Sequence, residues 1–233
     1  MLLKVLLVTI CGILFGGTIR PPHPPAKNAV VFYKGQPIEY FIRGIAYFGM
    51  VVLTAAFSYF ATTILILNSS PRVEYLIPYV CPTGSNVAAS LSGYSPRFIA
   101  GFTLVVIGAI LRLWSYHTLG TLFTFEVVIT QEHRLVKSGP YAFARHPSYT
   151  GVMVLMLGVH FIQFGPGGYV SECNIVSTPI GFLVYVWWAC LFLVPLSLLR
   201  RCFVEDAQLH KHFADDWVQY REEVSYRLIP YVF

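Results

Sequence analysis

Long apolar stretches alternate with shorter polar ones along the whole chain. Five stretches, of which the fourth is the shortest, are apolar enough to cross a bilayer, since about 20 such residues span a hydrocarbon core of about 30 Å. They are Met1–Ile19, Tyr40–Leu67, Phe98–Trp114, Tyr149–Phe164 and Thr178–Leu199. The pattern predicts an all-α integral membrane protein with about five transmembrane helices, the last two of which could form a hairpin.

The first apolar stretch fits two interpretations. Lys4, the apolar run after it and the small residues Gly16 and Gly17 are typical of a cleaved signal peptide. A retained helix agrees better with the number of spans that the charge distribution requires, so we expect Met1–Ile19 to remain in the protein.

The polar connections between the spans predict loops. Arg20–Glu39 is rich in proline and cannot be helical throughout. Arg72–Ser95 contains several prolines and glycines and little helical periodicity, which also indicates a loop. Arg43 and Arg112 lie near the ends of their spans, where we expect their side chains to snorkel toward the headgroups.

The C-terminal region leaves the membrane at Arg200 and Arg201. Beyond them, apolar residues recur with an amphipathic helical period, interrupted by Ala214, Asp215 and Asp216, which offer a capping carboxylate. Two short helices or one long helix fit this pattern equally well. The periodic residues are Leu209, Phe213, Trp217, Tyr220 and Val224.

Composition supports the membrane assignment. The chain is 56% hydrophobic and 12% charged, against about 25% charged residues in soluble domains. Its 233 residues suffice for a single membrane domain over 1–233, without a separate soluble catalytic domain. The formal charge is +5, but the basic residues are scattered rather than clustered with aromatics, so we expect no nucleic-acid partner.

The distribution of Lys and Arg predicts the orientation. With five spans, the loops Arg20–Arg43, His117–Pro147 and Arg200–Phe233 share one side and hold twelve basic residues. The loops Asn68–Arg97 and Gly165–Ser177 hold two. The positive-inside rule therefore predicts a cytosolic location for the first set of loops and an external or luminal N-terminus.

The five cysteines carry no CxxC motif and none has a histidine at metal-ligand spacing, so we expect no zinc or redox site. Cys11, Cys190 and Cys202 are interpreted as packing residues. Cys81 and Cys173 fall in the two loops assigned to the non-cytosolic side, where an oxidising lumen would permit a disulfide. Two unpaired loop thiols are the other interpretation.

The stretch from Gln131 to Gly151 is a polar island between apolar segments. Gly139 and Pro140 indicate a turn, and Pro147 biases His146 away from helical geometry, so a new helix should begin just after His146. The first turn of that helix leaves backbone N–H groups without intrahelical partners. With Arg145 beside them, these groups predict a site for a carboxylate or phosphate.

Two blocks of residues carry a resemblance to a known family. The first is His133, Leu135, Val136, Gly139, Pro140, Tyr141, Arg145, His146, Pro147, Tyr149 and Gly151. The second is Arg201, Glu205, Asp206, Leu209, Phe213, Tyr220, Val224, Arg227 and Pro230. Together they resemble the protein-S-isoprenylcysteine O-methyltransferase family of membrane methyltransferases, over about Leu119 to Pro230. The family usually has Glu where Asp206 stands.

The resemblance implies an S-adenosylmethionine-dependent enzyme that methylates the C-terminal α-carboxylate of prenylated cysteine in CaaX-processed proteins. It implies an endoplasmic reticulum membrane, an active site facing the cytosol, a membrane-spanning half over 1–116 and a methyltransferase core over 117–233. The implied catalytic residues are Arg201, Glu205 and Arg145. The implied cofactor-binding residues are His133, Leu135, Val136, Gly139, Tyr141, His146, Tyr149 and Glu205.

The chemistry of such a reaction limits what the protein must supply. An α-carboxyl group, with a pKa near 3.5, is already ionised at pH 7, so positioning and desolvation matter more than a base. A guanidinium can hold the carboxylate in a fixed plane. Arg201 is our first candidate for this role and Arg145 the second, with Trp217 and Tyr220 enclosing the site. The chain has no strand–GxG–helix signature, so a Rossmann crevice is not expected.

Two other functions stay open at this point. A phosphatidylethanolamine-type phospholipid N-methyltransferase would need a base such as Glu205 or His146, because its ammonium acceptor has a pKa near 10. A non-catalytic lipid-binding membrane protein could retain the same fold. The i,i+4 pair Arg201 and Glu205 could also be a helix surface pair worth only about 0.3–0.5 kcal/mol.

Overall fold

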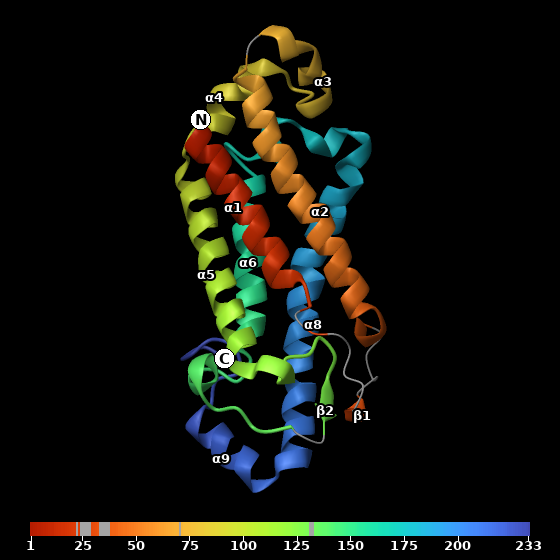
Figure 1. Cartoon of the computed structure of the whole chain (residues 1–233), viewed down its shortest axis with the longest axis vertical. Coiled ribbons are helices and arrows are strands. Elements are labelled where there is room, and N and C mark those ends of the chain that lie inside the picture. The colour runs from red at the N-terminus through yellow and green to blue at the C-terminus, as the bar shows by residue number, and fades with distance from the viewer. Residues whose placement is uncertain (22, 24–28, 33–37, 70, 131–132) are drawn as a thin grey trace. The chain divides into compact units, whose positions relative to one another are not determined.

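The computed structural model describes residues 1–21, 23, 29–32, 38–69, 71–130 and 133–233 (Figure 1). Most of the described chain is helical, which confirms the all-α prediction. The longer helices are α1 (Leu2–Ile19), α2 (Ile38–Leu67), α5 (Pro96–Leu119), α6 (Pro147–Gln163), α8 (Phe182–Phe213) and α9 (Asp215–Glu223). The shorter ones are Pro71–Leu76, α3 (Ile77–Val80), Ser85–Val87, α4 (Ala88–Ser92), Gly120–Leu122, Gly139–Ala142, α7 (Tyr169–Glu172), Ile175–Ser177 and Pro179–Gly181.

Four helical segments within the described residues are long and apolar enough to cross a membrane. They are Leu2–Ile19, Tyr40–Leu67, Pro96–Leu122 and Pro179–Phe213. The remaining predicted span corresponds to α6, which has 17 residues. At 1.5 Å per residue α6 is about 25 Å long, near the lower limit for a span. The chain is therefore an integral membrane protein.

The chain forms two compact units. The first contains Met1–Gly17, Val51–Ile107 and Val154–Val194, and the second contains Thr18–Met50, Gly108–Met153 and Pro195–Phe233. All the residues of the two family-like blocks that the structure describes fall in the second unit.

Close helix packing marks the first unit. A Cβ added at Gly101 of α5 would lie 2.9 Å from the Gly158 carbonyl oxygen of α6, and one added at Gly158 would lie 2.8 Å from the Gly101 carbonyl oxygen. The two glycines therefore let the backbones of these helices touch, as small residues do in membrane helix pairs. Lys4 of α1 is fully buried and donates to the Gly93 carbonyl, so α1 is part of the packed interior.

Two connections of the first unit are more ordered than the sequence pattern predicts. Arg72–Ser95, expected to be a loop, contains four short helical segments. Pro78 stands in the first turn of α3. Proline is tolerated at this position, because a backbone N–H there would have no acceptor within the helix. The expectation of a loop was therefore wrong. A disulfide joins Cys81 to Cys173, with their Cα atoms 4.7 Å apart, which decides between the two interpretations of these cysteines.

In the second unit, β1 (Ala29–Phe32) pairs antiparallel with β2 (Val128–Thr130). The proline-rich segment that contains β1 was expected to be a loop, and its residues 22, 24–28 and 33–37 lie outside the described residues. The strand itself differs from that expectation, because its partner lies about a hundred residues away in the sequence and leaves no local signal.

Two arginines expected to snorkel are instead bound inside the second unit. Arg43 forms an ion pair with Glu126, its Nη2 lying 3.0 Å from Oε2. Arg112 is buried, and its guanidinium donates to the Thr18 carbonyl at 2.6 Å and to the Ser148 hydroxyl at 2.9 Å. The snorkelling prediction was wrong because these buried acceptors replace the headgroup region.

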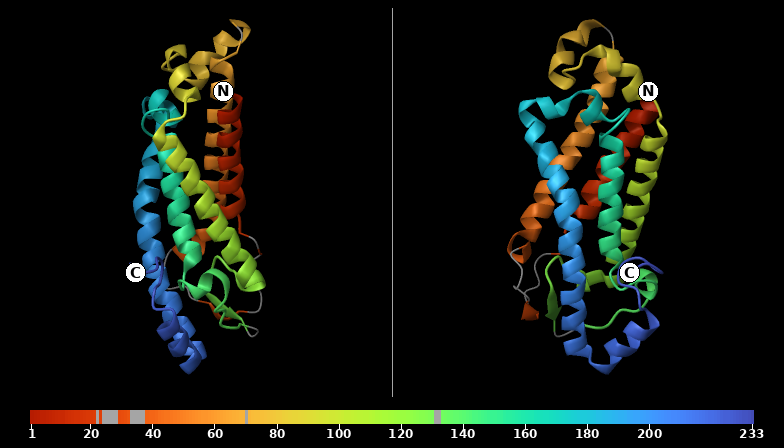
Figure 2. Two further views of the ribbon diagram at one scale, coloured as in Figure 1. Left: turned by 90° about the vertical axis from the view of Figure 1, so that its left-hand side faces the viewer. Right: turned by 180° about the vertical axis from the view of Figure 1, so that it is seen from behind.

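The C-terminal region, for which two short helices or one long helix were predicted, contains a long helix followed by a short one. α8 does not end at Leu199 but continues to Phe213, as the long ribbon in Figure 2 shows. Ala214 then interrupts it with a positive φ of 45°, and α9 follows. Because α8 is continuous, Arg201, Glu205 and Asp206 are held on the same helix that begins at Phe182.

Candidate active site

Glycine and proline shape the loop that leads into α6. Gly139 has a φ of +61°, and a Cβ there would lie 2.7 Å from the Thr118 hydroxyl oxygen, so only glycine fits without strain. Pro147 is the first residue of α6, as its fixed φ favours. The loop therefore presents Arg145 and His146 immediately before a rigid helix.

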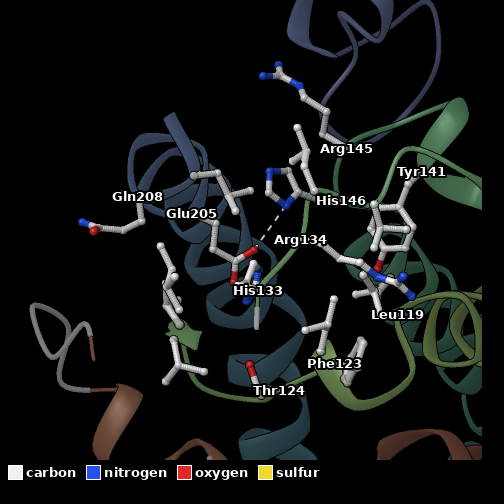
Figure 3. A pocket seen from close by; sticks show the side chains of 18 of the residues that line it. Leu119, Phe123, Thr124, His133, Arg134, Tyr141, Arg145, His146, Glu205 and Gln208 are labelled. Carbon is white, nitrogen blue, oxygen red and sulfur yellow. Dashed lines mark ion pairs between the residues drawn. The ribbon is translucent and has the colours of Figure 1, made fainter. Parts of the chain in front are cut away.

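His146 lies between two carboxylates of α8. Its Nδ1 is 3.3 Å from Glu205 Oε2 (Figure 3). Its Nε2 is 3.0 Å from Asp206 Oδ1. Burial of the ring opposes protonation, but the hydrogen bonds that the ring donates to Asp206 and Glu205, together with the charges of these acids, outweigh it and raise the pKa of His146. The imidazolium form can donate to both carboxylates at once.

Glu205 accepts three side-chain donors. Besides His146, it accepts the Tyr149 hydroxyl and the Arg201 Nε, the latter at 2.8 Å. The rings of His146 and Tyr149 stack nearly parallel, with centroids 5.6 Å apart. The Arg201 side chain is only 3% exposed, so its pair with Glu205 is not a surface pair and its strength is not limited by solvent screening.

Asp206 faces a different set of partners. Its Oδ2 lies 2.9 Å from Arg145 Nη1 and 3.0 Å from Arg227 Nε, while Oδ1 bonds His146. Asp206 and Arg227 belong to the second block of family-like residues but were not predicted to be site residues. The pair of adjacent acids, Glu205 and Asp206, could have indicated the role of Asp206. Neighbouring residues on a helix point about 100° apart, so the two acids can face two environments.

A pocket in the second unit has the side chains of Glu205 and His146 in its wall (Figure 3). Arg145 lines it too, but its guanidinium extends away from Glu205 (Figure 3). Predicted site residues that line the pocket are His133, Leu135, Val136, Tyr141, Arg145, His146, Tyr149 and Glu205. The lining residues among the described ones do not include Gly139 or Arg201. Tyr220, which was expected to enclose the site, also lines the pocket. Unpredicted lining residues are Leu119, Leu122, Phe123, Thr124, Glu126, Val127, Val128, Ile129, Arg134, Ser148, Gln208 and Leu209.

α9 closes part of the pocket. Trp217, Tyr220 and Val224 form a buried apolar cluster against which Leu135 and Leu209 pack. The Tyr220 hydroxyl donates to the Tyr141 carbonyl at 2.8 Å, which ties α9 to the Gly139–Ala142 turn. Tyr220 contacts the pocket directly, and Trp217 supports it from the cluster.

The segment after α9 runs beside the loop that precedes α6. The N–H of Arg145 donates to the Tyr226 carbonyl at 3.0 Å, and that of His146 to the Arg227 carbonyl at 2.7 Å. Arg145 Nη2 also donates to the Ser225 carbonyl at 3.1 Å. The Arg145 guanidinium, which was expected to serve an anion site at the start of α6, is thus bound to Asp206 and Ser225, and the anion site itself stays a prediction.

His133 contributes a different kind of group to the pocket. Its burial, with a smaller effect from His212, lowers the pKa of the imidazole, so it is neutral at pH 7. A neutral histidine offers one donor and one acceptor to a polar ligand.

These groups fit a cationic ligand with an aromatic part. Glu205 brings a carboxylate into the pocket wall, its side chain 21% exposed, while Leu119, Phe123 and Leu135 supply apolar surface. A sulfonium or ammonium would be attracted to that carboxylate, and an aromatic base would pack on the apolar wall. S-adenosylmethionine has all three groups, so the residues present fit this cofactor.

The sequence of this region has clear relatives. Residues 100–178 match the isoprenylcysteine carboxyl methyltransferase (ICMT) family. The resemblance drawn from the motifs is therefore confirmed, and the match to the ICMT family begins upstream of Leu119. The second block, from Arg201 to Pro230, lies beyond the matched residues.

Curated proteins with similar sequences carry the name of this family's enzymes. The chain is 32% identical over 126 residues to protein-S-isoprenylcysteine O-methyltransferase B of Arabidopsis thaliana, covering 53% of this chain and 55% of that protein. It is 27% identical to protein-S-isoprenylcysteine O-methyltransferase of Saccharomyces cerevisiae, covering 58% and 49%. It is 25% identical to a probable protein-S-isoprenylcysteine O-methyltransferase of Oryza sativa subsp. japonica, covering 84% and 90%. The matched part of the chain thus spans about half the length of the first two proteins.

Proposed function

We propose that this protein is an S-adenosylmethionine-dependent methyltransferase that esterifies the C-terminal α-carboxylate of prenylated cysteine in CaaX-processed proteins. The observation that carries the proposal is the placement of Glu205 and His146 in the wall of one pocket, within a chain whose residues 100–178 match the ICMT family. The names of the related proteins support the same reaction.

The cofactor site is proposed to be the pocket of the second unit. When bound, S-adenosylmethionine supplies a methyl group on a positively charged sulfur. Glu205 supplies a carboxylate in the wall, whose charge is shared with Arg201 and His146, and Tyr149 and Arg201 fix its orientation. Gly139 contributes through the turn that carries Tyr141 rather than by lining the pocket. The other proposed cofactor residues are His133, Leu135, Val136, Tyr141, His146 and Tyr149.

The acceptor carboxylate needs a cation that holds it rather than a base that deprotonates it. Arg201 is the first candidate for this role because its Nε is bonded to Glu205, the acid in the pocket wall, whereas Arg145 bonds Asp206 and Ser225. Burial of Arg201 makes such a contact stronger than it would be at a surface. Arg145 is proposed as a positioning residue that acts through Asp206.

The proposed orientation places the pocket in the cytosol, in a multi-pass protein of the endoplasmic reticulum membrane. The twelve-to-two distribution of basic residues supports this orientation. The disulfide between Cys81 and Cys173 supports it independently, because both cysteines lie in the loops assigned to the non-cytosolic side and disulfides persist in an oxidising lumen. We propose residues 117–233 as the methyltransferase core and 1–116 as the membrane-spanning half.

The decisive experiment compares acceptors. Purified protein in lipid nanodiscs is given labelled S-adenosylmethionine with either N-acetyl-S-farnesylcysteine or phosphatidylethanolamine. Base-labile methyl transfer to the farnesylcysteine is the expected result. Methylation of phosphatidylethanolamine instead would move the assignment to a phospholipid N-methyltransferase, and cofactor binding without transfer to either acceptor would contradict the proposed substrate.

A further inference from the structure

The turn Ile229–Phe233 exposes a dense set of apolar side chains. Tyr231 is 89% exposed, Val232 75% and Ile229 44%. The turn is nevertheless ordered by its backbone, because the N–H groups of Leu228 and Ile229 donate to the Phe233 carbonyl at 2.8 and 3.1 Å. A turn in contact with water is normally built from polar residues, so this one suits an apolar environment.

The neighbouring face of α8 is apolar apart from Arg200. Leu196, Arg200 and Phe203 lie on one face of α8 by their helical spacing, and all three are exposed, Leu196 at 48% and Phe203 at 51%. Phe203 lies about 30 Å along the helix axis from Phe182, which matches the thickness of a hydrocarbon core. A membrane span that begins at Phe182 would place Phe203 at the depth where acyl chains give way to headgroups.

The turn packs at this same depth. The Phe233 and Phe203 rings are 6.2 Å apart, and the Arg227 guanidinium lies 4.3 Å from the Phe203 ring centroid and 5.5 Å from that of Phe233. An arginine among aromatic rings is a typical composition for a membrane interface, where the rings meet the acyl chains and the cation meets the headgroups.

We propose that Ile229–Phe233 is an interfacial lipid anchor, whose partner is the bilayer surface beside the emerging end of α8. Ile229, Tyr231 and Val232 insert at the boundary between headgroups and acyl chains. The surface is continuous with the lipid-facing face of α8, which identifies lipid as its occupant.

The anchor is joined to the candidate active site by direct bonds. Leu228, next to the turn, accepts a hydrogen bond from the Thr150 hydroxyl at 2.8 Å. Arg227 accepts the His146 N–H and donates to Asp206. A membrane-seated turn thus fixes the loop before α6 from the bilayer side.

The test measures lipid contact and does not depend on the proposed reaction. Full-length protein carrying Tyr231→Cys in a Cys190→Ala background is labelled with an environment-sensitive fluorophore and placed in phosphatidylcholine nanodiscs. Glu222→Cys, on an exposed position of α9, is the matched control. Doxyl-labelled lipids should remove most of the fluorescence at position 231 and little at 222, while aqueous iodide should show the reverse order.

A second position guards against a local effect of the label, so Val232→Cys is measured in the same way and should behave like Tyr231→Cys. Strong iodide quenching and weak lipid quenching at both 231 and 232 would overturn the proposal. Shielding from both quenchers would overturn it as well, since that result means a second protein copy or another protein covers the turn.

Discussion

Two adjacent carboxylates on α8 serve two different regions of the molecule. Glu205 faces the pocket, where it bonds His146, Tyr149 and Arg201. Asp206 faces the loop before α6 and the C-terminal segment, where it bonds Arg145 and Arg227. This difference underlies our proposal that Glu205 contacts a ligand and that Asp206 holds the wall in place. Variants of the two acids should therefore fail in different ways.

The largest effect is expected at Asp206. Asp206→Ala leaves three buried or half-buried cationic groups without their shared carboxylate, and removing one partner of a buried charge pair costs about 3–5 kcal/mol. Thermal unfolding of the purified variant in detergent should show this loss of stability. Asp206→Glu, which keeps the carboxylate, should recover much of the stability. Equal stability of wild type and Asp206→Ala would contradict the supporting role.

His146 links the two regions, and its contribution should depend on pH. Its folded pKa is raised above the ordinary value of 6.5, so the stabilisation by the charged imidazole is fully present below about pH 6.5. It is lost as the pH rises through the raised folded pKa. The stability difference between wild type and His146→Gln should therefore be about 1.5–3 kcal/mol at pH 6 and shrink at higher pH. A difference that grows with pH would contradict a raised pKa.

The turn that carries Tyr141 offers a smaller perturbation. Gly139→Ala adds a Cβ within 2.7 Å of the Thr118 hydroxyl oxygen at a φ of +61°, which we expect to cost about 1–3 kcal/mol. Gly44→Ala is the matched control, since nothing lies within 4 Å of a Cβ added there. Thermal unfolding should separate the two variants. Identical melting temperatures would show that the turn is not constrained.

The smallest change in stability is expected for Arg201→Lys. The substitution keeps the charge but loses the planar donor that fixes Glu205, so we expect a cost of about 1 kcal/mol in stability. Methyl transfer should fall much more steeply if Arg201 also holds the acceptor carboxylate. A lysine variant with full activity would remove Arg201 from the proposed catalytic residues.

Local sequence signals predicted the parts of the fold that depend on local physics. Apolar runs located the spanning helices, Pro147 located the start of α6, and Gly139 marked a strained turn. Proline also indicated a loop in Arg72–Ser95, and this prediction was wrong because Pro78 stands in the first turn of α3. The C-terminal end of α8 also lies beyond the predicted span, which stopped at Leu199, because the polar residues that follow do not stop a helix.

Long-range partners could not be predicted. Arg43 and Glu126 are 83 residues apart, Arg112 and Thr18 are 94 apart, and His146 and Asp206 are 60 apart. Nothing in the residues near Arg112 shows that a carbonyl from α1 will replace the headgroup region as its acceptor. The motifs predicted many of the residues that line the pocket. The different partners of Glu205 and Asp206 could be seen only in the structure.

The central claim is that Glu205 faces a bound S-adenosylmethionine while Asp206 holds the wall. It is tested most directly by the calorimetric affinity of Glu205→Gln for the cofactor, with Glu223→Gln on the exposed side of α9 as the control. Loss of a charge-assisted contact of about 1.5–3 kcal/mol should weaken binding by roughly 10- to 150-fold in Glu205→Gln and leave the control unchanged. An affinity of Glu205→Gln equal to that of the wild type, in a folded protein, would contradict the claim.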